Sequence, residues 1–268
     1  MKYLTIDTTT KVTALSLAED GKLMAEGFLH TTKNHSERLI PMLDQLMKTA
    51  NWELKELSLI GVVRGPGSFT GIRIGIATGQ GLAQVLRIPV IGVLSLDALA
   101  WAGWGREADI VPILDARKNE WYTARYSWLG KADETERENG TENAEMSGPK
   151  CLTQPKAIAP DDWLAELKDL GRKICFVGDA AEKNRSLISS ILGENGIALP
   201  EYQSLPRGAY AAQAVWYQYR LEQLKEVKDP ETGREYDPVT VEPFYIRLSE
   251  AEVNWAKKEE ARKQHDER

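Results

Sequence analysis

The chain has 268 residues, of which 42% are hydrophobic, enough for two lobes that each enclose a core. Its formal net charge of −6 argues against broad contacts around a nucleic-acid duplex, because lysine and arginine drive phosphate binding. A local basic patch remains compatible with this charge. The two cysteines, Cys151 and Cys175, form neither a disulfide framework nor a CxxC metal site, so we expect free thiols in a reducing compartment.

The first residues, MKYLTIDTTT, are typical of a strand. They lack the basic region and the long apolar region of a signal peptide. No apolar run approaches the ~20 residues that a membrane helix needs. We therefore expect a soluble, cytoplasmic protein that has no membrane partner.

The first hundred residues are strongly patterned and predict the element order βββαβαβα. Alternating short runs separated by turns predict an antiparallel meander, and apolar residues at helical spacing predict the helices. The predicted elements are strands at 3–7, 12–17 and 23–29, a helix that begins at Asn34 or Ser36, a strand at 59–64, a helix at 72–86, a strand at 88–94 and a helix at 96–102.

The second half repeats this order in weaker form. Its predicted elements are strands at 109–115, 121–126 and 150–153, a helix at 161–170, a strand at 173–177 and helices at 182–192 and 208–227, with an exposed loop over 129–149. Two such halves in tandem are the signature of the actin-like (ASKHA) α/β fold. We expect an N-terminal lobe over 1–104, a degenerate C-terminal lobe over 105–227, and a linker, an extended segment and a charged helical tail over 228–268.

The most distinctive stretch is RGPGSFTGIRIG, residues 64–75, which follows a predicted strand and opens a predicted helix. Backbone N–H groups in such a loop can point at an anion, and a helix N-terminus favours negative charge. It is neither a Walker A loop nor a GxGxxG loop, because the closing lysine is missing and the glycines are spaced too widely. An anion loop and a tight structural turn are both open interpretations.

Two other turns that would form a nucleotide site lack the glycines that such a site needs. An actin-like ATPase needs glycine after its first strand so that backbone can approach the phosphates, but the turn at residues 7–10 reads DTTT. The matching turn at 115–117 reads DAR, so we expect no cofactor. Asp7 and Asp115, the aspartates of these two turns, either face each other across a cleft or bond nearby backbone N–H groups. The candidate anion-facing residues are Asp7, Thr8, Thr9, Arg64, Gly65, Gly67, Ser68, Phe69, Thr70, Gly71, Arg73 and Asp115.

Small residues recur at four-residue spacing in the second predicted helix, at positions 71, 75, 79 and 83. Each interior glycine costs ~1 kcal/mol of helix stability relative to alanine, so something must pack very close to this stripe. The neighbour is either the protein's own sheet or a helix of another protein. In the second case the partner-binding residues are His35, Leu39, Leu43, Leu46, Ile72, Gly75, Ile76, Gly79 and Ala83. An exposed apolar face of this kind also predicts a homodimer when the partner is absent.

The chain resembles the TsaB (YeaZ-like) family through several of these segments. They are RGPGSFTGIRIG, the turn DTTT, HSE at 35–37, LDAR at 114–117 and EPFYIR at 242–247; the resemblance is strong over residues 1–126 and weaker beyond. It implies an actin-like fold, pairing with the catalytic paralogue TsaD and the ATPase TsaE, and a requirement in threonylcarbamoylation of the tRNA adenosine next to the anticodon. It also implies that tRNA is reached only through the complex, and that the first two long helices meet their TsaD counterparts as a four-helix bundle.

The catalytic paralogue carries H-x-E-x-H on its first helix to hold a metal, whereas this chain reads HSERL at residues 35–39. One histidine does not make a catalytic metal site, which normally needs three protein ligands. We therefore expect no metal and no catalytic residue, and a role for His35 at the helix start or an interface. The alternatives are an ATP-dependent kinase, which would need glycine-bearing loops in both lobes, and a glycoprotease-type metallopeptidase, which would need a second histidine at Leu39.

Overall fold

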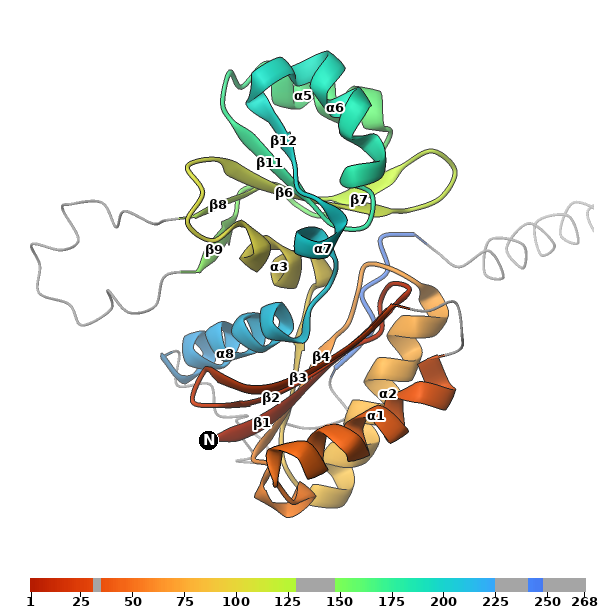
Figure 1. Ribbon diagram of the computed structural model, residues 1–268, viewed down its shortest axis with the longest axis vertical. Coiled ribbons are helices and arrows are strands. Elements are labelled where there is room, and N and C mark those ends of the chain that lie inside the picture. Colours follow the sequence, from red (N-terminus) through yellow and green to blue (C-terminus); the bar gives the residue numbers. More distant parts are fainter. Residues whose placement is uncertain (31–34, 129–147, 225–240, 248–268) are drawn as a thin grey trace, which may run out of the picture.

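The computed structural model describes residues 1–30, 35–128, 148–224 and 241–247, which form two lobes, the lower and upper halves of Figure 1. The sheet of the first lobe has the strand order β3-β2-β1-β4-β5, and the main path of the second sheet is β10-β7-β6-β11-β12. Counted along these two five-strand paths alone, both have the order third, second, first, fourth, fifth. The predicted tandem repeat is therefore confirmed.

The first lobe follows the predicted order closely. Its elements are β1 (Lys2–Asp7), β2 (Val12–Glu19), β3 (Lys22–His30), α1 (His35–Ala50), the 3-10 turn η1 (Leu54–Glu56), β4 (Leu59–Val63), α2 (Phe69–Leu86), β5 (Val90–Val93), α3 (Ser95–Ala100) and the 3-10 turn η2 (Trp101–Gly103). The first three strands pair antiparallel, and β1, β4 and β5 pair in parallel. Helix α2 begins three residues before the predicted start, because Ser68 accepts a hydrogen bond from the backbone N–H of Gly71 and caps the helix.

The second lobe is built from shorter strands. Its elements are β6 (Asp109–Asp115), β7 (Trp121–Thr123), β8 (Tyr126–Trp128), β9 (Pro149–Cys151), β10 (Lys156–Ile158), α5 (Pro160–Lys168), β11 (Ile174–Val177), η4 (Glu182–Asn184), α6 (Arg185–Leu192), η5 (Gly193–Asn195), β12 (Gly196–Ala198), α7 (Glu201–Ser204) and α8 (Gly208–Leu224). The strand β12 and the helix α7 were not predicted.

Two predicted strands of this lobe need correction. The single strand expected at 121–126 is divided into β7 and β8, because the backbone of Arg125 bonds the side chain of Thr153 and the N–H of Leu152 instead of β6. The third strand of the repeat is β10, which pairs with β7. The segment predicted for that place, 150–153, contains most of β9, which lies off the main path and pairs with β8.

The lobes exchange helices at their junction. Helix α8 follows the second lobe in sequence but packs on the first sheet, where Ala211, Ala212 and Val215 lie in one buried cluster with Tyr3 and Leu59. Helix α3 belongs to the first repeat, yet its buried residues Leu96, Leu99 and Ala100 pack against β6 and β11 of the second sheet. Each of these two helices thus packs on the sheet of the other lobe, and the boundary expected at residue 104 stays a prediction.

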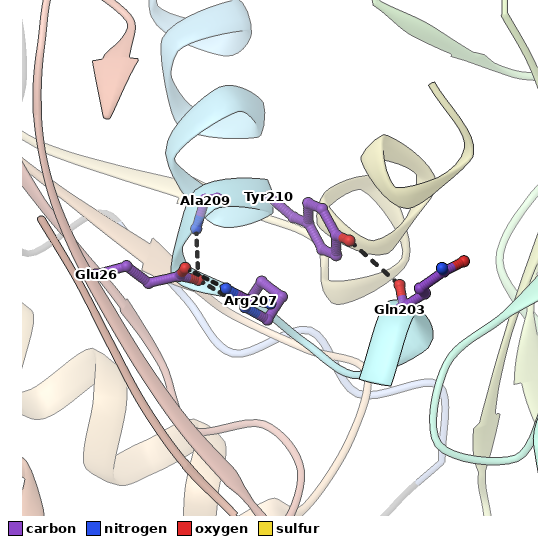
Figure 2. Close-up of polar contacts among 5 residues, drawn as sticks. All are labelled: Glu26, Gln203, Arg207, Ala209 and Tyr210. Atoms are coloured by element: carbon purple, nitrogen blue, oxygen red, sulfur yellow. Dashed lines mark hydrogen bonds and ion pairs between the residues drawn. The ribbon is translucent and has the colours of Figure 1, made fainter. Parts of the chain in front are cut away.

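The entry into α8 is held by a carboxylate from β3, as Figure 2 shows. Glu26 accepts hydrogen bonds from Arg207 Nε at 2.9 Å and Nη2 at 2.5 Å, and from the backbone N–H of Ala209 at 3.2 Å. It thereby caps the first turn of α8, whose N–H groups have no partner within the helix. Close by, the Tyr210 hydroxyl donates to the carbonyl of Gln203 in α7 at 3.2 Å.

Candidate functional site

The loop between β4 and α2 packs against the turn that follows β1. The N–H of Ser68 donates to the carbonyl of Thr9 at 2.6 Å, and the Thr8 hydroxyl donates to the carbonyl of Gly71 at 2.6 Å. A Cβ atom on Gly67 would overlap the Thr9 carbonyl, and one on Gly71 would overlap that of Thr8. These glycines are therefore required by the chain's own backbone, which favours the tight structural turn over the anion loop.

The larger side chains of this loop contact the segment 241–247. The Arg73 guanidinium lies 4.0 Å from the centre of the Phe69 ring, and its Nε donates to the Tyr245 hydroxyl at 3.0 Å. Arg64 lies beside the Phe244 ring, with its guanidinium 5.6 Å from the ring centre. The two arginines expected to face an anion thus have aromatic neighbours, whereas Thr70 is exposed; anion binding by the loop stays a prediction.

Asp7 ends β1 with its side chain buried, at 2% exposure. Its Oδ1 accepts hydrogen bonds from the N–H of Thr9 at 2.9 Å and from the Thr9 hydroxyl at 2.7 Å. Burial raises the pKa of this carboxyl, and the two Thr9 hydrogen bonds and the nearby His35 oppose that rise. The turn-forming interpretation accounts for this aspartate.

Asp115 ends β6, the equivalent strand of the second lobe, and makes the same kind of turn. Its Oδ1 accepts from the N–H of Arg117 at 2.8 Å, two residues on, as Asp7 accepts from Thr9. Its own N–H donates to Asp179 at 3.1 Å, and burial raises the pKa of the Asp179 carboxyl. Asp7 and Asp115 therefore form equivalent turns, in which each carboxylate accepts from the backbone N–H two residues further on.

His35 begins α1 and is tied to the first turn through both ring nitrogens. Its Nε2 lies 2.8 Å from the carbonyl of Thr10, and its Nδ1 lies 2.7 Å from the Thr13 hydroxyl. A carbonyl only accepts, so Nε2 carries the proton and in the neutral ring Nδ1 accepts from Thr13. This geometry matches the expected role at the helix start.

The stripe of small residues on α2 faces the protein's own sheet. A Cβ on Gly79 would overlap Val62 of β4, and one on Gly75 would lie 2.6 Å from the Thr8 hydroxyl. The other apolar residues predicted for partner binding are also buried, with exposures of 8% or less; they are Leu39, Leu43, Leu46, Ile72, Ile76 and Ala83. The prediction that these residues form an exposed face is therefore wrong, because the sheet covers the face that they share.

The opposite face of α2 is the one that is open. Arg73, Ala77, Gly81 and Val85 recur there at four-residue spacing, and all are exposed. Among the residues that the structure describes, a Cβ on Gly81 would meet none outside its own helix backbone and chain neighbours within 4 Å, and Val85 is 82% exposed. On α1, Ile40 is 51% exposed. We call Ile40, Ala77, Gly81 and Val85 the outer helix face; the same four-residue spacing in the sequence could have pointed to it.

Three further observations concern metal binding and membrane-spanning helices. Among residues 1–30, 35–128, 148–224 and 241–247, no three acidic, histidine or cysteine side chains gather as a metal would require. Leu39, which stands where a second histidine would be needed, is buried at 1% exposure. The helices in the same described ranges include none that is long and apolar enough to span a membrane.

Comparison with known proteins gives consistent matches. The model of a family described as TsaD, tRNA N6-adenosine threonylcarbamoyltransferase, matches residues 29–255. The tRNA threonylcarbamoyladenosine biosynthesis protein TsaB of Bacillus subtilis is 31% identical over 261 residues, which cover 95% of this chain and 98% of that protein. TsaB of Escherichia coli is 32% identical over 166 residues, 61% of this chain and 70% of that protein.

A solved structure from Pseudomonas aeruginosa, described as similar to peptidase YEAZ, has a TM-score of 0.66 and 22% identity, and covers 92% of this chain and 99% of that one. At this identity the likeness concerns the fold alone. The repeated sheet order, with α3 and α8 exchanged between the lobes, defines an actin-like protein. By its match to the Bacillus subtilis protein over nearly the whole of both chains, this chain belongs to the TsaB family.

Proposed function

We propose that this chain is a non-catalytic subunit in tRNA threonylcarbamoyladenosine biosynthesis, the process named for its TsaB relatives. Its partner is a TsaD-like catalytic paralogue, which binds the outer helix face of α1 and α2. A TsaE-like ATPase joins the same assembly, and tRNA is reached only through the complex.

The observation that carries this proposal is the open side of Gly81. Glycine in a helix interior is costly, and at Gly79 the cost is explained by Val62 of the sheet, but a Cβ atom on Gly81 would meet no other described residue within 4 Å. Together with Ala77 one turn earlier, Gly81 leaves room for the backbone of a second helix. Val85, one turn further along α2, is an exposed apolar side chain, and so is Ile40 on α1.

The non-catalytic role is supported by the two aspartate turns. In each lobe the turn after the first strand is closed by an aspartate that bonds the backbone two residues on, at Asp7 and at Asp115. Neither turn has a glycine through which backbone N–H groups could approach a phosphate. A kinase fits these turns less well, and a metallopeptidase would need a second histidine where the chain has Leu39.

The test is the affinity of Gly81→Leu for the TsaD-like partner, measured by calorimetry beside its melting temperature. A leucine at a close helix contact costs ~1–3 kcal/mol, which is roughly a tenfold or greater loss of affinity. The melting temperature should not fall below that of the wild type, because the side chain enters solvent and leucine is a better helix former than glycine. Ser189→Leu on the exposed side of α6 is the matched control. Unchanged partner affinity in Gly81→Leu would move the interface elsewhere.

A further inference from the structure

The segment Val241 to Arg247 lies against both lobes. At its start, Gln80 of α2 donates to the carbonyl of Val241 at 3.1 Å. Further on, the N–H of Phe244 donates to the carbonyl of Arg64 at 2.7 Å, directly after β4. These contacts join residues that are more than 150 positions apart in the chain.

Two glycines of the first lobe make room for this segment. A Cβ atom on Gly92 of β5 would lie 2.7 Å from Val241 Cγ1, and one on Gly65 would lie 2.5 Å from the carbonyl oxygen of Phe244. Val241 is 9% exposed and belongs to the same buried cluster as Leu39 and Ile72. The segment is therefore part of the packed structure of the first lobe.

Aromatic stacking extends this attachment toward the start of α2. The rings of Phe69 and Tyr245 stack with their centres 4.9 Å apart. The Arg73 guanidinium lies over the Phe69 ring, and its Nε donates to the Tyr245 hydroxyl. A flat cation and two rings in contact favour one fixed arrangement of the three side chains.

The far end of the segment reaches the second lobe. The Arg247 guanidinium forms an ion pair with Glu120 and a long hydrogen bond of 3.5 Å to the carbonyl of Ala116. Ala116 and Glu120 bracket a turn of three residues with positive φ, and the N–H of Ala116 donates to the carbonyl of Glu120 at 3.0 Å. Arg247 thus holds both ends of the turn that follows β6.

We propose that residues 241–247 form a strap that fixes the angle between the two lobes, with the contact between Arg247 and Glu120 as the end that opens. At the first-lobe end Val241 is buried, and the segment is hydrogen-bonded to Gln80, Arg64 and Arg73. The Arg247 and Glu120 side chains are each 30% exposed, and partly exposed ion pairs are weak. Release therefore begins at the second lobe.

The test measures the distance between spin labels, one on each lobe, by pulsed electron paramagnetic resonance. Lys55→Cys in the first lobe and Ser189→Cys in the second are exposed labelling sites. The exposed Cys151 is replaced by serine, whereas Cys175 is buried and stays. Dilution with unlabelled protein removes distances between molecules.

The full chain should give one narrow distance distribution. Arg247→Glu and Glu120→Arg should each broaden it toward longer distances, and the double exchange Arg247→Glu with Glu120→Arg should restore it. Lys118→Glu, an equal charge change in the same turn, should leave it narrow. A narrow distribution in Arg247→Glu, or no recovery in the double exchange, would overturn the proposal. If Arg247→Glu does not fold, Arg247→Gln and Glu120→Gln provide the same comparison with a smaller perturbation.

Discussion

Gly79 of α2 lies so close to Val62 of β4 that a Cβ atom on the glycine would overlap the valine side chain. Two residues further along the same helix, a Cβ atom on Gly81 would contact no other part of the described structure. The helix therefore has small residues on both sides, and they serve different contacts. The inner stripe allows α2 to approach the sheet, and the outer one is open to another molecule.

This difference predicts opposite effects of one substitution at two sites. Gly79→Ala should lower the free energy of unfolding by ~1–3 kcal/mol, because the new methyl group overpacks the contact with β4. Gly81→Ala should raise it by ~0.5–1 kcal/mol, since alanine is the better helix former and its methyl group enters solvent. Chemical denaturation of both variants measures the difference. Equal destabilisation by the two changes would contradict the assignment of the faces.

Self-association should depend on the outer helix face. The wild type should form a dimer, since an exposed apolar patch on two helices is readily covered by a second copy. Ile40→Asp and Val85→Asp should each shift the population to monomer in light scattering, with unchanged melting temperatures. Tyr202→Asp, an equally drastic change at a side chain that is 73% exposed on α7, is the control and should remain dimeric. A dimer that survives both charged variants would place self-association on another surface.

The carboxyl of Asp7 should make stability depend on pH. Burial raises its pKa above the ordinary value of 3.8, so the folded state binds the proton more tightly than the unfolded chain. The free energy of unfolding therefore falls as pH rises from that ordinary value through the raised one. Asp7→Asn keeps an acceptor for Thr9 and removes this fall, so the variant should match or exceed the wild type at pH 7.

Asp7→Ala provides the contrast at the same position. It leaves the buried N–H and hydroxyl of Thr9 without their acceptor, which should cost ~1–3 kcal/mol relative to Asp7→Asn at every pH. Denaturant titrations between pH 4 and pH 8 compare the three proteins. A wild type whose stability relative to Asp7→Asn does not change over this range would show that the carboxyl does not titrate as inferred.

Glu26 should stabilise the docking of α8 on the first lobe (Figure 2). Glu26→Ala removes the acceptor for the N–H of Ala209 and for the Arg207 guanidinium, and loss of a helix cap costs ~0.5–2 kcal/mol. Glu26→Gln keeps one acceptor and should lose less. Hydrogen exchange of the first turn of α8 should rise more in Glu26→Ala than in Glu26→Gln. Equal exchange in both variants would mean that the carboxylate does not cap this helix.

The isolated chain should neither hydrolyse ATP nor retain a stoichiometric metal. The reasons are the two closed aspartate turns and the leucine at position 39 in place of a histidine. Calorimetry with ATP and elemental analysis of metal-replete protein measure both properties. ATP binding with turnover would favour the kinase, and one tightly held zinc or iron per chain would favour the metallopeptidase.

Much of the architecture could be predicted from the sequence. The alternating runs at 3–7, 12–17 and 23–29 and the helical spacing of Leu39, Leu43 and Leu46 predicted the first lobe nearly element by element. These signals are local, because a half-buried strand or helix repeats its apolar residues at a fixed period. The second lobe was harder to predict, since strands of three residues such as β9 and β10 are too short to show an alternation of apolar and polar residues.

What local patterns could not provide was the neighbour of each face. The glycine stripe of α2 required a close contact, but whether Gly79 meets Val62 or another protein depends on how α2 lies on β4, and that is set by packing between segments. The same holds for residues 241–247, whose partners Arg64, Gln80 and Glu120 lie more than a hundred positions away. Side-chain periodicity fixes which residues share a face, whereas contacts between distant segments decide what covers it.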